Sequence, residues 1–245
     1  MAVLNNITKL KEIDRLKSQM VRMTSHDLKN PLFSIMTYME LLEEDGAPVF
    51  DNDMTHYVQA IWKQLTRMER IIKGILDLEK VQSGAPPMIP TDLGKLLETC
   101  AHSIEDQAQS RRVEFQADIE DGLHHVLADA SQLEQVVSNL LDNALKYTLA
   151  GGSIWLRAHN LEDAVIIEVE DTGLGIPREV QNQVFDRFFR VKSTQTETVS
   201  GSGIGLSLVK AIIDHHKGRV WLKSEIGVGT SFYVTLPALR EPVAM

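Results

Sequence analysis

The sequence predicts two domains: an all-α helical hairpin, followed by an α+β two-layer sandwich. In the first part, apolar residues recur at spacings of three and four through two long segments, which is the pattern of one helix face. In the second part, helical and β-type segments are mixed without the regular βαβ alternation of a parallel sheet. Residues 82–87, rich in Ser, Gly and Pro, separate the two parts and are typical of a linker.

The composition is that of a soluble globular protein, with 43% hydrophobic and 24% charged residues. The net charge of −9 argues against a nucleic-acid partner, because phosphate backbones require a basic face. Cys100 is the only cysteine, so no internal disulfide can form and a reducing compartment is expected. No run of eighteen apolar residues occurs and the N-terminus lacks a signal-peptide core, so we expect no membrane contact by this segment. The expected location is the cytoplasm, either as a free protein or as the cytosolic part of a membrane-anchored one.

The helical hairpin is expected at residues 13–83, after a tail at residues 1–12 that belongs to an upstream segment. Its first helix begins near Ile13 and stops at the Asp-Gly-Ala-Pro run of residues 45–48. Its second helix is expected at residues 54–81. Two antiparallel helices cannot enclose a core by themselves, so their apolar stripes predict pairing with a second copy into a four-helix bundle.

The sandwich domain is expected at residues 92–240, between a linker at residues 84–91 and a C-terminal tail at residues 241–245. Its expected helices are residues 92–110, 131–147 and 204–216, and its expected strands are residues 113–119, 125–128, 153–160, 164–170, 219–224 and 230–236. The polar segment at residues 172–202 is expected to hold at most a short helix.

The first helix carries an unusual polar group, His26 and Asp27, with Asn30 four residues after the histidine. Pro31 follows, and its ring crowds the carbonyl group of residue 27, so we expect a bend that presents the imidazole to solvent. A neutral imidazole is a competent nucleophile, and a neighbouring carboxylate can orient it and accept its proton. Because adjacent residues do not face each other on a straight helix, the role of Asp27 depends partly on the bend.

Three polar residues share one face of the expected helix at residues 131–147: Asn139, Asn143 and Lys146, at positions i, i+4 and i+7. Asparagine is unfavourable inside a helix, so two on one stripe require a reason. Amide oxygens are ligands that Mg²⁺ accepts when phosphate oxygens supply the negative charge, and Lys146 can attract those phosphates. The alternative is a polar helix face with one buried amide.

Two glycine-rich segments follow. Asp171, with Gly173 and Gly175 after it, ends a strand; the carboxylate can accept the exocyclic amine of adenine, and the glycines let the backbone approach a flat ring. The alternative is an ordinary turn with a surface aspartate. The second segment, containing Gly201, Gly203 and Gly205, opens a helix, as at phosphate sites, although this signal is weak by itself. It is not the dinucleotide fingerprint, and no phosphate loop of the common NTPases occurs in the sequence.

The order of six motifs resembles the characteristic boxes of sensor histidine kinases in two-component systems. The motifs are HDLKNPL at 26–32, NLLDNALKYT at 139–148, DTGLGIP at 171–177, VFDRFFRV at 184–191, GSGIGLSLVK at 201–210 and GVGTSFYVTLP at 227–237. The resemblance covers the chain from about Ile13 to Leu236. It implies a HisKA-type dimerisation and phosphoacceptor domain, followed by an ATP-binding domain of the GHKL, or Bergerat, type.

The resemblance also implies a role for each matching residue. His26 would be the phosphoacceptor, Asp27 its acid–base partner, and Asn30 the amide that positions water for dephosphorylating a partner. Asn143, with Asn139, would hold Mg²⁺, Lys146 the phosphates of ATP, and Asp171 the adenine, while Tyr147 would pack near the nucleotide. Gly173, Gly175, Gly201, Gly203 and Gly205 would shape the pocket and its lid.

The partners that the resemblance implies are a second copy of the chain, the receiver domain of a response regulator, and an upstream sensory domain in a longer parent protein. Residues 2–16 resemble the tail of a PAS-type sensory domain. The chain departs from the family pattern with Asp27 for Glu, Lys29-Asn30 for Arg-Thr, and Ile204 for Leu. Asp is one methylene shorter than Glu, which bears on its reach to the imidazole.

Three other functions were weighed: a clamp ATPase of the gyrase, mismatch-repair or heat-shock chaperone type; a catalytically silent signalling scaffold; and a predominantly phosphatase enzyme. The helical hairpin with its histidine motif ahead of the asparagine motif argues against the first, and the intact motifs argue against the second. The sequence does not identify the stimulus, the cognate regulator, or whether phosphorylation occurs within or between subunits.

Overall fold

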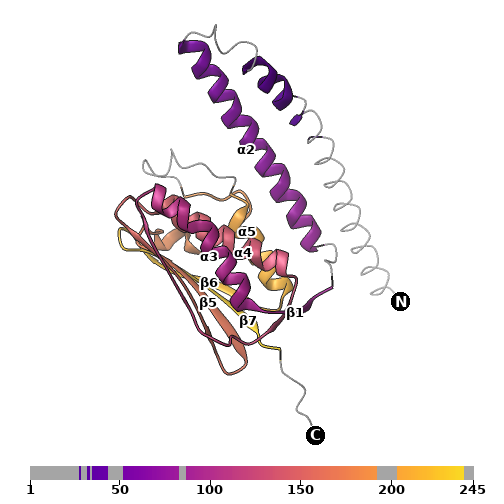
Figure 1. Ribbon diagram of the computed structural model, residues 1–245, viewed down its shortest axis with the longest axis vertical. Coiled ribbons are helices and arrows are strands. Elements are labelled where there is room, and N and C mark those ends of the chain that lie inside the picture. Colours follow the sequence, from indigo (N-terminus) through magenta and orange to yellow (C-terminus); the bar gives the residue numbers. More distant parts are fainter. Residues whose placement is uncertain are drawn as a thin grey trace, which may run out of the picture. The chain divides into compact units, whose positions relative to one another are not determined.

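The computed structural model describes residues 28, 32–33, 35–43, 52–82, 87–191 and 203–239. The chain separates into two compact units (Figure 1). The described residues up to 82 belong to the helical unit, and those from 87 onward belong to the sandwich unit.

The helical unit contains helix α2 (Asn52–Gln82), which confirms the expected second helix. The described residues of the first helix, 28, 32–33 and 35–43, are also helical. The two segments pack through a hydrophobic core whose members repeat at helical spacings: Leu32, Leu65 and Ile72 are buried, with Met36, Met39 and Leu76 against them. The residues of the polar group His26, Asp27 and Asn30, and Pro31 beside them, lie outside the described residues.

The sandwich unit is built on a five-stranded sheet with the order β2-β4-β5-β7-β6. Its strands are β2 (Glu114–Ile119), β4 (Ser153–Asn160), β5 (Ala164–Asp171), β6 (Arg219–Glu225) and β7 (Gly229–Pro237). Strand β2 runs parallel to β4, and the other neighbours are antiparallel. All five were expected from their apolar and β-branched runs, with bounds within two residues of those observed.

A second, two-stranded sheet joins β1 (Ile89–Thr91) to β3 (Val126–Ala128) in antiparallel register. Strand β3 was expected, but residues 89–91 were assigned to the linker. The segment Ile-Pro-Thr is too short to show alternation, and its central Pro90 argues against a strand. It becomes a strand through its pairing with β3, a partner that lies far along the chain.

Three helices cover one face of the large sheet, α3 (Leu93–Ser110), α4 (Ala130–Tyr147) and α5 (Gly205–His215) (Figure 1). The side chains of Asp92 and Asp129 accept hydrogen bonds from the first amides of α3 and α4, as N-caps do. In β4, Ile154, Leu156 and Ala158 alternate with less buried residues, so the sheet turns its apolar face toward the helices. The expected two-layer sandwich is therefore confirmed. None of the helices in the described part of the chain combines the length and apolar character that crossing a membrane requires.

His216 ties the end of α5 to the start of α4. Its Nε2 atom accepts the Asp129 backbone N–H at 3.1 Å, and its Nδ1 atom lies 2.8 Å from the Ile212 carbonyl oxygen. Both contacts are hydrogen bonds only when the ring is neutral with its proton on Nδ1. Burial lowers the pKa of His216, and neighbouring His215 lowers it further, although the Ile212 contact and Asp129 oppose the shift. The neutral ring thus holds in place the N-cap of the helix that carries the asparagines.

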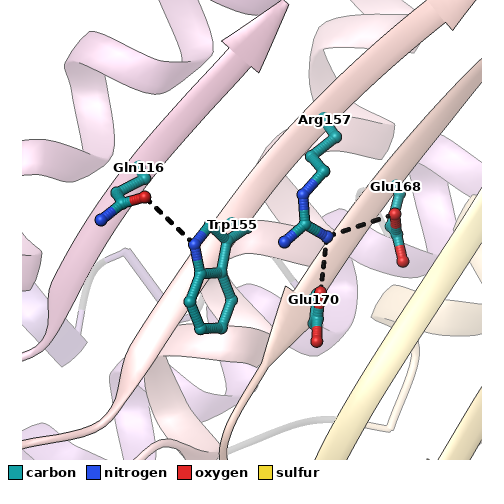
Figure 2. Close-up of polar contacts among 5 residues, drawn as sticks. All are labelled: Gln116, Trp155, Arg157, Glu168 and Glu170. Atoms are coloured by element: carbon teal, nitrogen blue, oxygen red, sulfur yellow. Dashed lines mark hydrogen bonds and ion pairs between the residues drawn. The ribbon is translucent and has the colours of Figure 1, made fainter.

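The other face of the sheet is open and carries a polar cluster on β2, β4 and β5 (Figure 2). Arg157 makes ion pairs with Glu168 and Glu170 on the neighbouring strand. The Arg157 guanidinium also lies 5.4 Å from the ring centre of Trp155, whose Nε1–H donates to Gln116 Oε1 at 3.2 Å. The side chains of this cluster connect three strands, and none of them belongs to the hydrophobic core.

We expect Arg157→Ala to lower the free energy of unfolding by about 1 kcal/mol, because it leaves two glutamates side by side and removes the cation from the Trp155 ring. Chemical denaturation of the variant measures the change. Arg219→Ala is the matched control, since Arg219 lies exposed on β6 and makes no ion pair among the described residues. An equal loss in both variants would contradict a specific role for the cluster.

Candidate nucleotide site

The predicted site residues of the sandwich unit come from three segments: the second half of α4, the loop after β5, and the start of α5. α4 contributes Asn139, Asn143, Lys146 and Tyr147; the loop contributes Asp171, Gly173 and Gly175; the start of α5 contributes Gly203 and Gly205. Gly201 lies outside the described residues, as do the three residues predicted around the phosphoacceptor: His26, Asp27 and Asn30.

The polar stripe of α4 has one free member. Asn139 Nδ2 donates to the Gln135 carbonyl oxygen of its own helix at 2.7 Å, and Lys146 Nζ lies 3.6 Å from Asp142 Oδ2. The half-buried Asn143 amide makes no hydrogen bond to any residue that the structure describes. A polar side chain of this kind is costly without a partner, so Asn143 is the member of the stripe that is suited to an external ligand.

Helix α5 begins directly against this stripe. A Cβ atom on Gly205 would lie 2.8 Å from Asn139 Oδ1, so a larger residue would force the Asn139 side chain to move. The residue before it, Ile204, provides no side-chain cap, which leaves the first amides of α5 open to a ligand. Gly203 precedes Ile204, and its carbonyl oxygen accepts a hydrogen bond from the Phe188 backbone N–H at 2.9 Å. This bond connects the start of α5 to the segment after β5.

Asp171 is a buried carboxylate at the end of β5. Burial raises its pKa to about 6, and neighbouring Glu170 adds to the increase, while hydrogen bonds from the backbone amides of Gly173 and Thr230 oppose it. The Gly173 N–H lies 2.8 Å from Asp171 Oδ1. The hydrogen bond from Gly173 is one that an aspartate makes in an ordinary turn. The burial of Asp171 and its raised pKa, however, distinguish it from a surface aspartate.

The loop after β5 is tied down on both sides. The Leu174 N–H donates to the carbonyl oxygen of Tyr147, the last residue of α4, at 3.2 Å, and the Leu174 oxygen accepts the Gly227 N–H at 2.9 Å. Gly175 has a positive φ of 71°, and a Cβ atom there would lie 2.0 Å from the Glu225 carbonyl oxygen. Only glycine satisfies both conditions, so the loop closes directly on the turn between β6 and β7.

The residues suited to a divalent cation are amides. No group of three or more His, Cys, Asp and Glu side chains is placed to hold a metal ion among the described residues. The unpartnered Asn143 amide, with Asn139 one turn earlier on the same face, fits a hard cation whose remaining ligands come from phosphate oxygens. The donor set therefore fits Mg²⁺ delivered together with a polyphosphate.

Sequence reasoning missed three residues that surround the loop: Gln181, Ser224 and Thr230. Thr230 lies inside the motif GVGTSFYVTLP and directly opposite Asp171 in the sheet, so the motif was a signal for it. Ser224 is opposite Thr230 on the next strand, and Gln181 lies in the short helix η2 (Arg178–Gln183). Neither is marked by any sequence pattern, because the sheet register brings Ser224 to the site and long-range hydrogen bonds hold Gln181 there.

We expect Asp171→Asn to stabilise the ligand-free protein by about 1–2 kcal/mol at pH 7.5, because the variant no longer buries a charge. The pKa of Asp171 in the fold, about 6, is above its ordinary value. The group therefore contributes to stability at low pH, and that contribution is lost as the pH rises through about 6. Denaturation at pH 5 and pH 7.5 measures the effect. A variant that is destabilised equally at both pH values would contradict it.

Two family models match the chain. The phospho-acceptor domain of His Kinase A matches residues 16–84, and the family of histidine kinase-, DNA gyrase B- and HSP90-like ATPases matches residues 128–240. A solved structure of ShkA in complex with AMPPNP has the same fold, with a TM-score of 0.72 at 24% identity, over 90% of this chain and 46% of that one.

Curated relatives resemble the chain over almost its whole length. Drug sensory protein A of Synechocystis sp. is 34% identical over 242 residues, which are 94% of this chain and 36% of the relative. The adaptive-response sensory kinase SasA of Synechococcus sp. is 35% identical over 237 residues, 94% of this chain and 62% of the relative. The chain thus spans from about a third to under two thirds of the length of these relatives. The chain therefore carries the core of a histidine kinase, with the phospho-acceptor domain followed by the ATPase domain.

Proposed function

We propose that the chain is an ATP-dependent protein-histidine kinase core, which phosphorylates its own His26 and passes the phosphoryl group to an aspartate of a response regulator. The single observation that carries this proposal is a nucleotide-type site with a buried Asp171 carboxylate and an Asn143 amide that has no partner among the described residues, in a chain that also matches a phospho-acceptor domain. The carboxylate suits the exocyclic amine of a nucleobase, and the amide suits a metal ion bound to phosphate.

The site supports ATP as the substrate. Asp171 would accept the exocyclic amine of adenine, and Tyr147 closes the loop beside it through its carbonyl group. Lys146 would attract the phosphates, and the open amides at the start of α5, with Gly203 and Gly205, would bind them. The AMPPNP complex of ShkA is a structure of the same fold with an ATP analogue bound.

Asn143 and Asn139 would hold Mg²⁺, which neutralises phosphate charge when bound. The chain's own groups do the rest by positioning and by proton transfer. The neutral His26 ring nitrogen attacks the γ-phosphorus, the bond to the β-phosphate oxygen breaks, and ADP leaves. Asp27 takes the ring proton. Asn30, an amide four residues further along the sequence, would orient a water molecule when the enzyme removes phosphate from its regulator.

Incubation with γ-labelled ATP tests the proposal. We expect label on the protein that is lost in acid and retained in base, as phosphohistidine requires. Release of labelled phosphate without labelled protein would instead indicate the clamp ATPase, and neither product would indicate a silent scaffold. Labelled protein that then transfers its phosphate to a receiver domain would complete the two-component reaction.

A homodimer is the second part of the proposal, supported by an exposed apolar stripe on each helix of the hairpin. Leu28, Ile35 and Leu42 lie seven residues apart on one helix, and Met54, Ile61 and Met68 on the other; all are 44% to 49% exposed. A seven-residue repeat is the pattern of helices that pack against a partner. The two stripes supply the second apolar surface that a four-helix bundle requires.

We expect Ile35→Lys combined with Ile61→Lys to give a monomer, because two buried charges would face the partner helices. Light scattering at several protein concentrations measures the mass. Thr37→Lys combined with Gln59→Lys is the matched control, since both residues are exposed and lie two positions from Ile35 and Ile61, on the opposite face of each helix. A doubly substituted stripe that still dimerises would contradict this interface.

The remaining partners follow from the proposed activity. A receiver domain accepts the phosphoryl group, an upstream sensory domain in a longer parent protein controls the kinase, and the reaction takes place in the cytoplasm. The relatives are longer than this chain, and the part of each that the chain does not match is long enough to contain such a domain.

A further inference from the structure

A row of hydrogen-bonding side chains crosses three strands at the end of the sheet. Asp171 on β5 lies opposite Thr230 on β7, and Thr230 lies opposite Ser224 on β6. Side chains of directly opposite residues point to the same face and lie close together. Asp171 and Thr230 are buried and Ser224 is half-buried, so a rearrangement of any one affects the others.

Only one arrangement of protons satisfies every contact of Ser224. Its hydroxyl oxygen lies 2.9 Å from the Gly229 carbonyl oxygen, 2.9 Å from Thr230 Oγ1 and 2.8 Å from the Ile176 backbone nitrogen. A carbonyl group only accepts, so the single Ser224 proton goes to Gly229. The Ile176 N–H donates to Ser224, and Thr230 must therefore donate to Ser224 as well.

This arrangement removes the only proton of the Thr230 hydroxyl from the site. Its remaining lone pairs only accept, and no described residue donates to them. The Asp171 carboxylate next to it also only accepts when ionised. Two groups that only accept hydrogen bonds therefore belong to directly opposite residues at the end of the sheet.

We propose that Ser224 is a positioning residue that holds the Thr230 hydroxyl as an acceptor, and thereby makes the site select an aminopurine over an oxopurine. The inference rests on the proposed function, in which the base of ATP meets Asp171. The exocyclic amine of adenine brings two donor hydrogens to this pair of acceptors. The oxygen that replaces it in hypoxanthine would face both acceptors without a proton, and such a mismatch costs more than a missing bond.

Gln181 holds the same loop in place through contacts that are independent of the Thr230 hydroxyl. Its Nε2 atom donates to the Ile176 carbonyl oxygen at 2.8 Å and to the Ser224 carbonyl oxygen at 2.9 Å. These bonds hold the loop against β6 but do not touch the Thr230 hydroxyl. Loss of Gln181 should therefore weaken any purine nucleotide equally, whereas loss of the Ser224 hydroxyl should change the choice between bases.

The test measures dissociation constants for ATP and for inosine triphosphate, in which an oxygen replaces the exocyclic amine. In the wild-type chain ATP should bind more tightly. In Ser224→Ala the Thr230 proton is free to turn toward the ligand, so the preference for ATP should fall by about fivefold to tenfold. Ser224→Thr retains a hydroxyl and should restore the preference. Gln181→Ala should weaken both ligands and leave their ratio unchanged.

Ser231→Ala is the matched control, because Ser231 follows Thr230 on β7 and faces the open side of the sheet. A ratio of affinities measured on one sample does not depend on the fraction that is folded, so a destabilised variant still gives an answer. An unchanged ratio in Ser224→Ala would overturn the inference while leaving the kinase proposal intact. A wild-type chain that binds neither nucleotide would instead overturn the proposed function.

Discussion

His26→Gln is expected to abolish phosphoryl uptake from ATP and to leave the affinity for ATP within about twofold of wild type. Glutamine keeps a polar side chain of similar length but has no nucleophilic ring nitrogen. All described residues of the proposed nucleotide site belong to the sandwich unit, so the substitution is expected to remove the acceptor and not the substrate. Gel autoradiography with γ-labelled ATP and calorimetric titration with a non-hydrolysable analogue measure the two quantities.

His102→Gln controls for the loss of a histidine, since His102 is exposed on α3 and belongs to no predicted site. Normal acid-labile labelling of the His26 variant would refute the assignment of the phosphoacceptor. Loss of nucleotide binding together with labelling would show that His26 matters for the ATP site or for the fold.

Asn143→Asp is expected to weaken Mg²⁺-ATP binding by about a hundredfold or more, because it places a carboxylate beside the phosphates. The wild-type amide is half-buried and has no partner among the described residues, so its replacement breaks no hydrogen bond of the fold. The melting temperature of the ligand-free protein should therefore change little. Calorimetric titrations in Mg²⁺ and in EDTA separate the metal-dependent part of the affinity.

Gln109→Glu is the matched amide-to-carboxylate control on an exposed position of α3. It should leave both titrations unchanged. An Asn143 variant that keeps the wild-type difference between Mg²⁺ and EDTA would remove this residue from the metal site.

The helices and long strands were predictable because their signals are local. The second hairpin helix and the run of β4 follow from spacing and alternation within a few residues. The sequence also marked the predicted site segments on α4 and after β5, because asparagine is unfavourable inside a helix and glycines after a strand permit a close approach of the backbone.

Strand β1 and the row from Asp171 to Ser224 could not be predicted in this way. β1 has three residues and a proline, and it depends on its pairing with β3. Ser224 is an ordinary serine in the sequence; its role comes from the register that places it opposite Thr230. The ion pairs of Arg157 likewise join two strands through a register that composition does not reveal.

By itself the sequence determined the two-domain order and most of the helices and strands that the structure describes, and it predicted which residues would bind a base, a cation and phosphates, because these depend on periodicity and on residue chemistry along the chain. The tertiary structure alone decided which groups share a surface: it buried Asp171 and raised its pKa, gave Asn143 no partner among the described residues, and placed Thr230 and Ser224 beside the loop. The reason is physical. Burial, desolvation and the direction of a hydroxyl proton are properties of neighbours in space, and those neighbours lie tens of residues apart in the chain.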